Sequence, residues 1–160
     1  MIINLGTPMA IKFASVQVSK LFVNSWINSY GVAVSAFAGI SAKIGSVANL
    51  VSMAINNAGS TMVGQNIAAK QFDRVKKIMV SIAWITITMA VFFSAVMLLF
   101  PDAIFGIFTA DEAVLDIVPG YLPIAVLLFF GAALRAIMNA LINGSGNYRI
   151  NFATAIFDGI

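Results

Sequence analysis

The amino-acid sequence predicts an all-α fold, a polytopic bundle of membrane-spanning helices. Hydrophobic residues make up 61% of the 160 positions and charged residues only 9%, and the mean hydropathy is +0.98. A water-soluble domain carries about 25% charged residues, because its surface must be hydrated. In a bilayer each backbone N–H must find its hydrogen-bond partner inside the protein, so long apolar runs are expected to be helical.

Four apolar runs are long enough to span a membrane as helices. The clearest covers 78–100 without any charge, and at helical rise it measures about 34 Å against a hydrocarbon core of about 30 Å. Pro8 suits the first turn of the first run, Gly31 marks a tight turn after it, and the second run exceeds the membrane thickness. The expected helices are 8–29, 32–69, 75–100 and 110–143, with the start of another at 150–160.

The helix expected at 110–143 begins with a recognisable signature. Thr109 is placed as its N-cap and Glu112 at the third helical position, which is the pattern of a capping box. Pro119 and Pro123 are expected to kink its early turns. The run that follows stops at residue 160, too short to cross a bilayer, so we interpret the chain as a piece of a larger membrane protein.

The connections between the runs differ in charge. Basic residues occupy one side, whereas the connections around Tyr30 and over 101–116 hold no Lys or Arg. This positive-inside signal places the N-terminus and the loop 65–77 in the cytoplasm and the loop 101–116 outside, in a multi-pass protein of the plasma (cytoplasmic) membrane. We interpret the basic run as an orientation signal, with no nucleic-acid partner; a nucleic-acid or specific lipid site is the alternative. The apolar residues within 104–108 are expected at the outer interface. The basic residues are Lys70, Arg74, Lys76, Lys77 and Arg149.

Three further basic residues lie far from the ends of their runs. Lys20 and Lys43 are eleven and twelve residues from Gly31, and Arg135 is eleven residues before Gly146. A Lys or Arg at the bilayer centre costs about 2.5–3.5 kcal/mol on insertion scales. We therefore expect these three side chains to converge on a hydrated cavity or to meet carboxylate partners.

Uncharged polar residues and these cations follow one another at spacings of three and four residues, so they share one face of each helix. The alternative is that Ser, Asn and Gly serve helix–helix packing, where an interhelical hydrogen bond contributes about 1–2 kcal/mol or less. Asp158, the one acid inside a membrane run, is a candidate ion-coupling residue or ion-pair partner. The candidate cavity residues are Gln17, Lys20, Asn24, Asn28, Lys43, Asn49, Asn56, Arg135 and Asn139, and Ser46, Ser52 and Ser60 share the face on the second helix.

The sequence argues against an enzyme. It contains no Cys and no His, which excludes disulfides, thiol catalysis, His-ligated zinc and His-based proton transfer. No G-x-S-x-G, H-E-x-x-H or phosphate-binding loop occurs. We expect no catalytic residue, no metal site and no cofactor.

Several short motifs resemble the carboxyl-terminal lobe of the multidrug and toxic compound extrusion (MATE) family. The motif GQNIAA at 64–69, followed by DRVKK at 73–77, is similar to the loop after the second helix of that lobe. GTPM at 6–9 and FAGI at 37–40 resemble the lobe's start and first hairpin, and NAL at 139–141 with GSGN at 144–147 resembles the end of its fourth helix. The resemblance implies helices seven to ten of twelve and the start of the eleventh, over residues 1–160.

The resemblance implies half of a two-lobed, twelve-helix secondary transporter, a cation-coupled antiporter that exports drugs or toxic organic compounds by alternating access. Na⁺ or H⁺ would be the coupling ion. The implied partners are the lipid bilayer, a small-molecule substrate and the missing amino-terminal six-helix lobe. Some family members carry an acid in the first or fourth helix of this lobe, where this chain has Lys20 and Arg135, so the coupling acid would be Asp158 or lie in the missing half. The alternatives are a related flippase or exporter of an anionic or lipid-linked substrate and a non-transporting membrane scaffold.

Overall fold

The all-α expectation is confirmed, and the helices of the long apolar runs account for most of the chain. The computed structural model describes the backbone of residues 2–147, 150 and 153–154, and the side chains of 14–147, 150 and 153–154. Most of the run expected to start at 150–160, including Asp158, therefore lies outside the described residues. Within them there is no strand, and the helices are α1 (Ile2–Asn28), α2 (Val32–Ala68), α3 (Phe72–Leu99), α4 (Pro101–Gly106), α5 (Glu112–Leu115) and α6 (Val118–Ser145).

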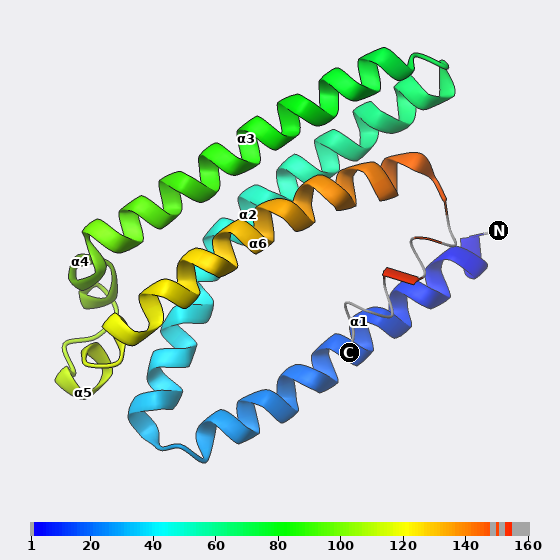
Figure 1. Ribbon diagram of the computed structural model, residues 1–160. Coiled ribbons are helices and arrows are strands. Elements are labelled where there is room, and N and C mark those ends of the chain that lie inside the picture. The colour runs from blue at the N-terminus through cyan, green and yellow to red at the C-terminus, as the bar shows by residue number, and fades with distance from the viewer. Residues whose placement is uncertain (1, 148–149, 151–152, 155–160) are drawn as a thin grey trace.

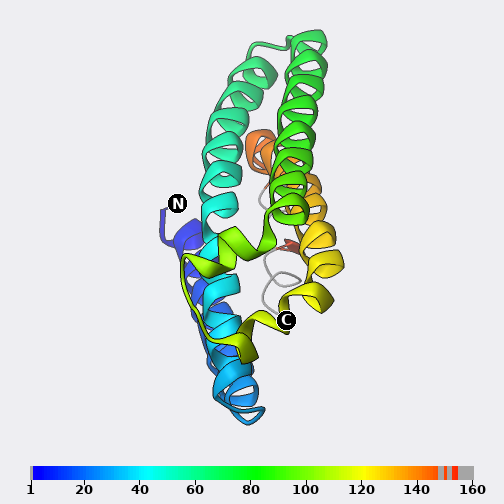
Figure 2. The same cartoon turned by 90° about the vertical axis from the view of Figure 1, so that its left-hand side faces the viewer.

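Helices α2, α3 and α6 form a three-helix bundle, and α1 diverges from it (Figures 1 and 2). The chain direction makes α2 and α6 parallel and α3 antiparallel to both (Figure 1). All three are long and apolar enough to cross a membrane. The bundle therefore has two ends, one at the α4–α5 segment and the other at the α2–α3 turn.

Two glycines end helices where the backbone takes a positive φ. Gly31 has φ 105° between α1 and α2, and Gly146 has φ 67° as the left-handed C-cap of α6. Glycine adopts this conformation without the clash that a Cβ atom would cause. At the α1–α2 turn the Ser35 hydroxyl also donates to Asn28 Oδ1 at 2.9 Å, which links the two helices beside the turn.

The segment expected as one helix over 110–143 is divided into α5 and α6. Pro119 lies in the first turn of α6, where a residue without an N–H is tolerated, so a new helix starts at Val118. The N-cap of α5 is Asp111 rather than Thr109, because Asp111 Oδ1 accepts from the Ala113 N–H at 3.0 Å. Thr109 Oγ1 instead accepts from the Asp111 N–H at 3.1 Å. Pro123 lies inside α6.

Helix α3 begins at Phe72, three residues before the expected start at 75. Its first turns therefore include the basic residues that the sequence places in a connection. Asp73 in the first turn has a favourable interaction with the positive end of the helix dipole. Charged side chains and a helical backbone are compatible here, because this end of the helix is exposed.

An aromatic cluster closes the bundle at the α4–α5 end. Phe105 of α4 is 0% exposed, which corrects the expectation that it lies at the outer interface with its neighbours. Its ring stacks on Phe37 of α2 with centroids 5.5 Å apart, and Tyr121 of α6 meets Phe37 edge-on at 5.2 Å. Such pairs contribute about 0.5–1.5 kcal/mol beyond their buried area. The short helices α4 and α5 are thus held by the same contacts that join α2 to α6.

Toward the other end, α2 and α6 approach closely through small residues. A Cβ atom on Gly144 would lie 2.7 Å from Val63 Cβ and 2.8 Å from the Ser60 carbonyl oxygen. A Cβ atom on Gly59 would lie 2.6 Å from Ile82 Cδ1 of α3 and 3.2 Å from Ala140 Cβ. Close approach of this kind is how helices associate in lipid, where burial of apolar surface gives no driving force.

Gly144→Ala is expected to destabilise the protein by about 1–3 kcal/mol, because the added methyl group overlaps backbone and Cβ atoms that cannot move away. Gly131→Ala is the matched control on the same helix, since its Cβ position is open. We expect Gly131→Ala to leave stability unchanged or raise it by about 0.5–1 kcal/mol. Thermal unfolding of the full-length protein in detergent measures both, and equal melting temperatures would contradict the close approach.

Candidate functional site

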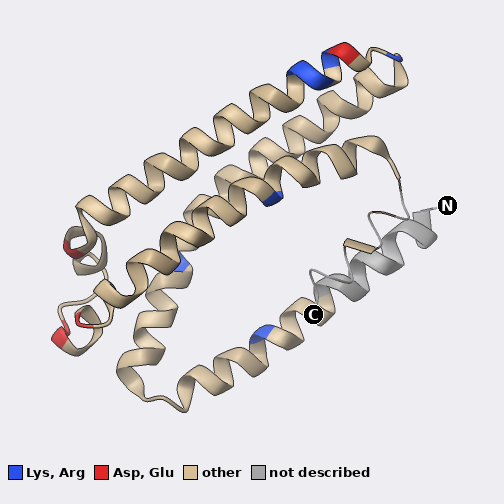
Figure 3. Ribbon diagram, viewed as in Figure 1, with Lys and Arg blue, Asp and Glu red and all other residues tan. Residues whose placement is uncertain are grey.

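The three basic residues expected in a cavity all lie outside the packed core of the bundle. Lys20 on α1, Lys43 on α2 and Arg135 on α6 are exposed. Figure 3 shows basic positions isolated on these three helices and clustered at the start of α3 beside one acidic position, with the other acidic positions at the α4–α5 end. None of the three makes an ion pair with a carboxylate in the part of the chain that the structure describes.

The register of the parallel helices sets the relative depth of Lys43 and Arg135. The close contacts pair Gly59 with Ala140 and Val63 with Gly144, so an α2 residue faces the α6 residue 81 positions later. Lys43 therefore faces position 124, eleven residues or about 16 Å from Arg135 along the axis. The structure does not bring these two cations together.

Lys20 and Lys43 are matched in distance from the α1–α2 turn. They lie eleven residues before and twelve residues after Gly31, which corresponds to about 17 Å of helix on each arm. Because α1 diverges from α2 beyond the turn (Figure 1), the two arms separate toward these positions. Two cations thus lie at one depth and Arg135 lies nearer the α2–α3 end.

The polar face of α1 is exposed from Gln17 as far as the last turn of the helix. Gln17, Lys20, Asn24 and Asn28 are all exposed, and only Asn28 has a hydrogen bond to α2, through Ser35. The face is therefore free of the bundle over most of its length. A polar helix face at membrane depth needs water or a further polar surface against it.

The polar face of α2 is divided between the exterior and the α6 contact. Asn49 is exposed, whereas Asn56 is half-buried and its Oδ1 has no hydrogen-bond partner among the described residues. Ser52 and Ser60 donate within α2, to the Ala48 and Asn57 carbonyl oxygens at 3.0 and 3.1 Å. On α6, Asn139 is half-buried. The hydroxyls of Ser52 and Ser60 are thus satisfied within α2, and the asparagines of this face are exposed or half-buried.

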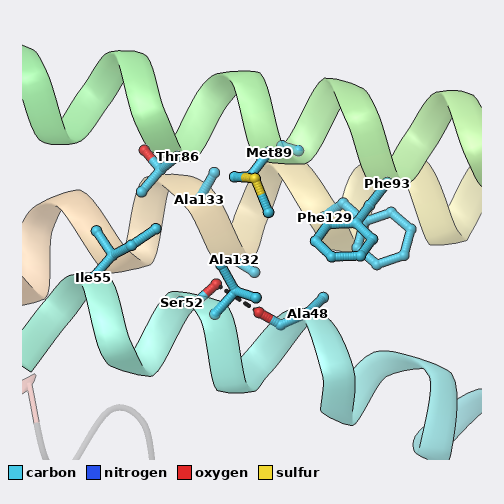
Figure 4. Close-up of a pocket in the computed structure, with 11 residues that line it drawn as sticks. Ala48, Ser52, Ile55, Thr86, Met89, Phe93, Phe129, Ala132 and Ala133 are labelled. Atoms are coloured by element: carbon cyan, nitrogen blue, oxygen red, sulfur yellow. Dashed lines mark hydrogen bonds between the residues drawn. The ribbon is translucent and has the colours of Figure 1, made fainter.

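The cavity inside the bundle is too small for a drug-sized compound. It lies between α2, α3 and α6 and has a volume of about 20 Å³, room for about one water molecule (Figure 4). Its walls are mostly apolar, with Phe93 and Phe129 stacked at 5.8 Å. Thr86 satisfies its hydroxyl within α3, donating to the Ile82 carbonyl oxygen at 2.9 Å.

The described residues contain no group of three or more acidic, His or Cys side chains that could hold a metal ion. Asp158, the candidate coupling residue, lies outside them.

The aromatic cluster of Phe37, Phe105 and Tyr121 was not predicted from the sequence. Its only sequence signal is an aromatic residue in each of three distant segments, which does not reveal that they meet.

The fold and its exposed polar faces define a multi-pass α-helical membrane protein with a dry core and polar residues outside it. The chain belongs to the MatE family, whose sequence profile matches residues 8–158, and the resemblance drawn from its motifs is thereby confirmed. It is 26% identical over 148 residues to a protein of Bacillus subtilis (strain 168) named "Probable multidrug resistance protein YoeA". The match covers 91% of this chain and 32% of that protein, so the chain spans about a third of its length. No solved structure gives a significant match.

We expect Lys43→Gln and Arg135→Gln to act independently on the activity of the full-length protein. Sites more than about 7–10 Å apart without shared partners are additive to about 0.3–0.5 kcal/mol, which is a factor of about two in rate. The rates of that activity for the two single variants and the double variant, measured in one assay, form the test. A double variant no slower than the slower single variant would show that both cations serve one site.

Proposed function

We propose that this chain is the carboxyl-terminal part of a secondary active transporter that exports drugs or toxic organic compounds. In this proposal residues 1–160 are helices seven to ten and the start of the eleventh in a two-lobed protein of twelve helices. The MatE membership and the printed name of the relative from Bacillus subtilis support this assignment. The missing amino-terminal lobe would complete the transporter.

The observation that carries the proposal is the contrast between a solid bundle core and exposed polar faces at membrane depth. The internal cavity holds about 20 Å³, whereas Lys20, Lys43 and Arg135 lie on outer surfaces. A charged side chain facing lipid is costly, so these surfaces require a hydrated space. A hydrated space between this part and a second lobe would serve as the substrate path.

Alternating access coupled to Na⁺ or H⁺ is the mechanism we propose. The two lobes would rock against each other around the central space, and a bound cation would bias that motion. Within the described residues the membrane helices offer no carboxylate at mid-depth. The coupling acid is therefore assigned to Asp158 or to the amino-terminal lobe.

We propose that the protein lies in the cytoplasmic membrane with the α2–α3 turn inside and the α4–α5 segment outside. The exposed acids Asp102, Asp111, Glu112 and Asp116 lie at or beside α4 and α5, and the basic residues around the α2–α3 turn lie at the opposite end (Figure 3). This is the arrangement that the positive-inside rule favours.

A second candidate is export or flipping of an anionic or lipid-linked substrate, and the exposed cations favour it. Three positive side chains that make no ion pair among the described residues would repel an organic cation unless other parts of the protein supply acids. A non-transporting scaffold is the third candidate. A scaffold does not require cations at membrane depth, so this candidate predicts that replacing them has no effect on activity.

Neutralising Lys20, Lys43 and Arg135 together to Gln is expected to lower efflux at least about tenfold, equivalent to about 1.4 kcal/mol in the barrier. The assay follows a fluorescent organic cation in vesicles that contain the full-length protein. Lys76→Gln is the control, because its exposed pair with Asp73 contributes about 0–1 kcal/mol.

The same assay separates the candidates. Unchanged flux in the triple variant would support the scaffold and contradict transport through these surfaces. Absence of cation efflux by the unmodified protein, together with binding of an anionic substrate that Arg135→Ala abolishes, would favour the second candidate.

A further inference from the structure

The α2–α3 turn carries an exposed group of cations without local compensation. Lys70, Arg74, Lys76 and Lys77 are all exposed. Lys76 Nζ lies 3.6 Å from Asp73 Oδ1, and among the described residues the other three make no ion pair. We call Lys70, Arg74 and Lys77 the basic turn. Three like charges this close repel one another unless an anion lies between them.

Two cations of the basic turn, Arg74 and Lys77, lie at the depth of lipid headgroups. The uncharged part of α3 begins at Ile78 and runs to the helix end at Leu99, about 33 Å, which matches a hydrocarbon core of about 30 Å. The headgroup layer adds about 5–7 Å on each side. Lys77 therefore lies at the hydrocarbon boundary, and Arg74 lies about 6 Å beyond Ile78, within that layer.

The spacing of Arg74 and Lys77 places both on one face of α3, three residues apart. Phe72, in the first turn of the same helix, is 59% exposed. Val75, between the two cations, is nearly buried at 9%. Arg74 and Lys77 thus share one exposed face of α3, and Phe72, two residues before Arg74, lies on a different face.

Lys70 occupies a backbone position that normally favours glycine. The Lys70 N–H donates to the Ile67 carbonyl oxygen at 2.9 Å, and the Gln71 N–H donates to the Asn66 carbonyl oxygen at 2.8 Å. These two bonds form a Schellman motif, in which the residue with positive φ is usually Gly. Lys70 has φ 58°, a left-handed conformation that a side chain disfavours. The chain has a lysine at this position, although glycine would adopt the left-handed conformation without backbone strain.

We propose that the basic turn binds the phosphate headgroups of anionic phospholipids in the leaflet that surrounds it. Orientation alone requires only that positive charge be present on this side, whereas binding requires Arg74 and Lys77 together on one face of α3 at headgroup depth. The ligand is assigned to the membrane because Lys77 lies at the hydrocarbon boundary and Arg74 lies within the headgroup layer. The inference depends on membrane insertion and not on the proposed export.

The test compares anionic and zwitterionic lipid at the turn of the full-length protein. Phe72→Trp, on a background whose other tryptophans are replaced, supplies the fluorophore, and the protein is placed in nanodiscs. Quenching by brominated phosphatidylglycerol relative to brominated phosphatidylcholine gives the preference. Nanodiscs expose both faces, so a change of membrane orientation does not alter the measurement.

We expect a preference for phosphatidylglycerol that decreases as salt is raised. Arg74→Gln and Lys77→Gln should each lower it about fivefold. Lys70→Gly should lower it similarly while leaving the melting temperature equal or higher, because glycine suits the left-handed position. This variant separates binding from folding, and efflux assays on it show independently whether export fails.

The matched control is the double variant Asp73→Asn and Lys76→Gln, which removes the ion pair and keeps the net charge. It should retain the preference. Equal preference in Lys70→Gly, Arg74→Gln and the unmodified protein would overturn the proposal. Displacement of the lipid by inorganic phosphate or by an oligonucleotide at low concentration would also overturn it, because the site would then take soluble anions.

Discussion

The close approach of α2 and α6 is the constraint on which the rest of the structure depends. In lipid, helices gain little from burying apolar surface, so association depends on van der Waals contact and needs small residues at the crossing. Gly59 and Gly144 provide that contact, because a Cβ atom at either position would overlap its neighbours. The same contact sets the register between the two parallel helices, and α3 packs against both. At the α4–α5 end the aromatic rings of Phe37, Phe105 and Tyr121 hold this arrangement.

The register decides where polar residues lie. Since the bundle interior is filled by small and aromatic side chains, its cavity holds about 20 Å³, and charged residues remain on the outer surfaces. Lys43 and Arg135 then fall at different depths along the bundle. Helices α2, α3 and α6 pack as one bundle, and α1 is connected to this bundle through the turn at Gly31.

The helices were predictable because lipid leaves a backbone few alternatives, and because Gly31 and Gly146 mark helix ends by their conformational freedom. The sequence could not show the register, since Gly59 meets Ala140 and Val63 meets Gly144 across 81 residues through steric fit alone. Nor could it show that Phe105 is buried, or that Asn56 is half-buried while Asn49 on the same helical face is exposed. Periodicity identifies a polar face, but the neighbouring helix determines what that face contacts.

Water accessibility in the membrane tests the account most directly. The chain has no Cys, so single cysteines can be introduced on a cysteine-free background of the full-length protein. A membrane-impermeant thiol reagent is predicted to label cysteines at Lys43 and Arg135, and to leave those at the buried positions Thr86 and Ala133 unmodified. Labelling at the two buried positions, or none at Lys43 and Arg135 when lipid-soluble reagents do reach them, would contradict a dry bundle with a hydrated outer surface.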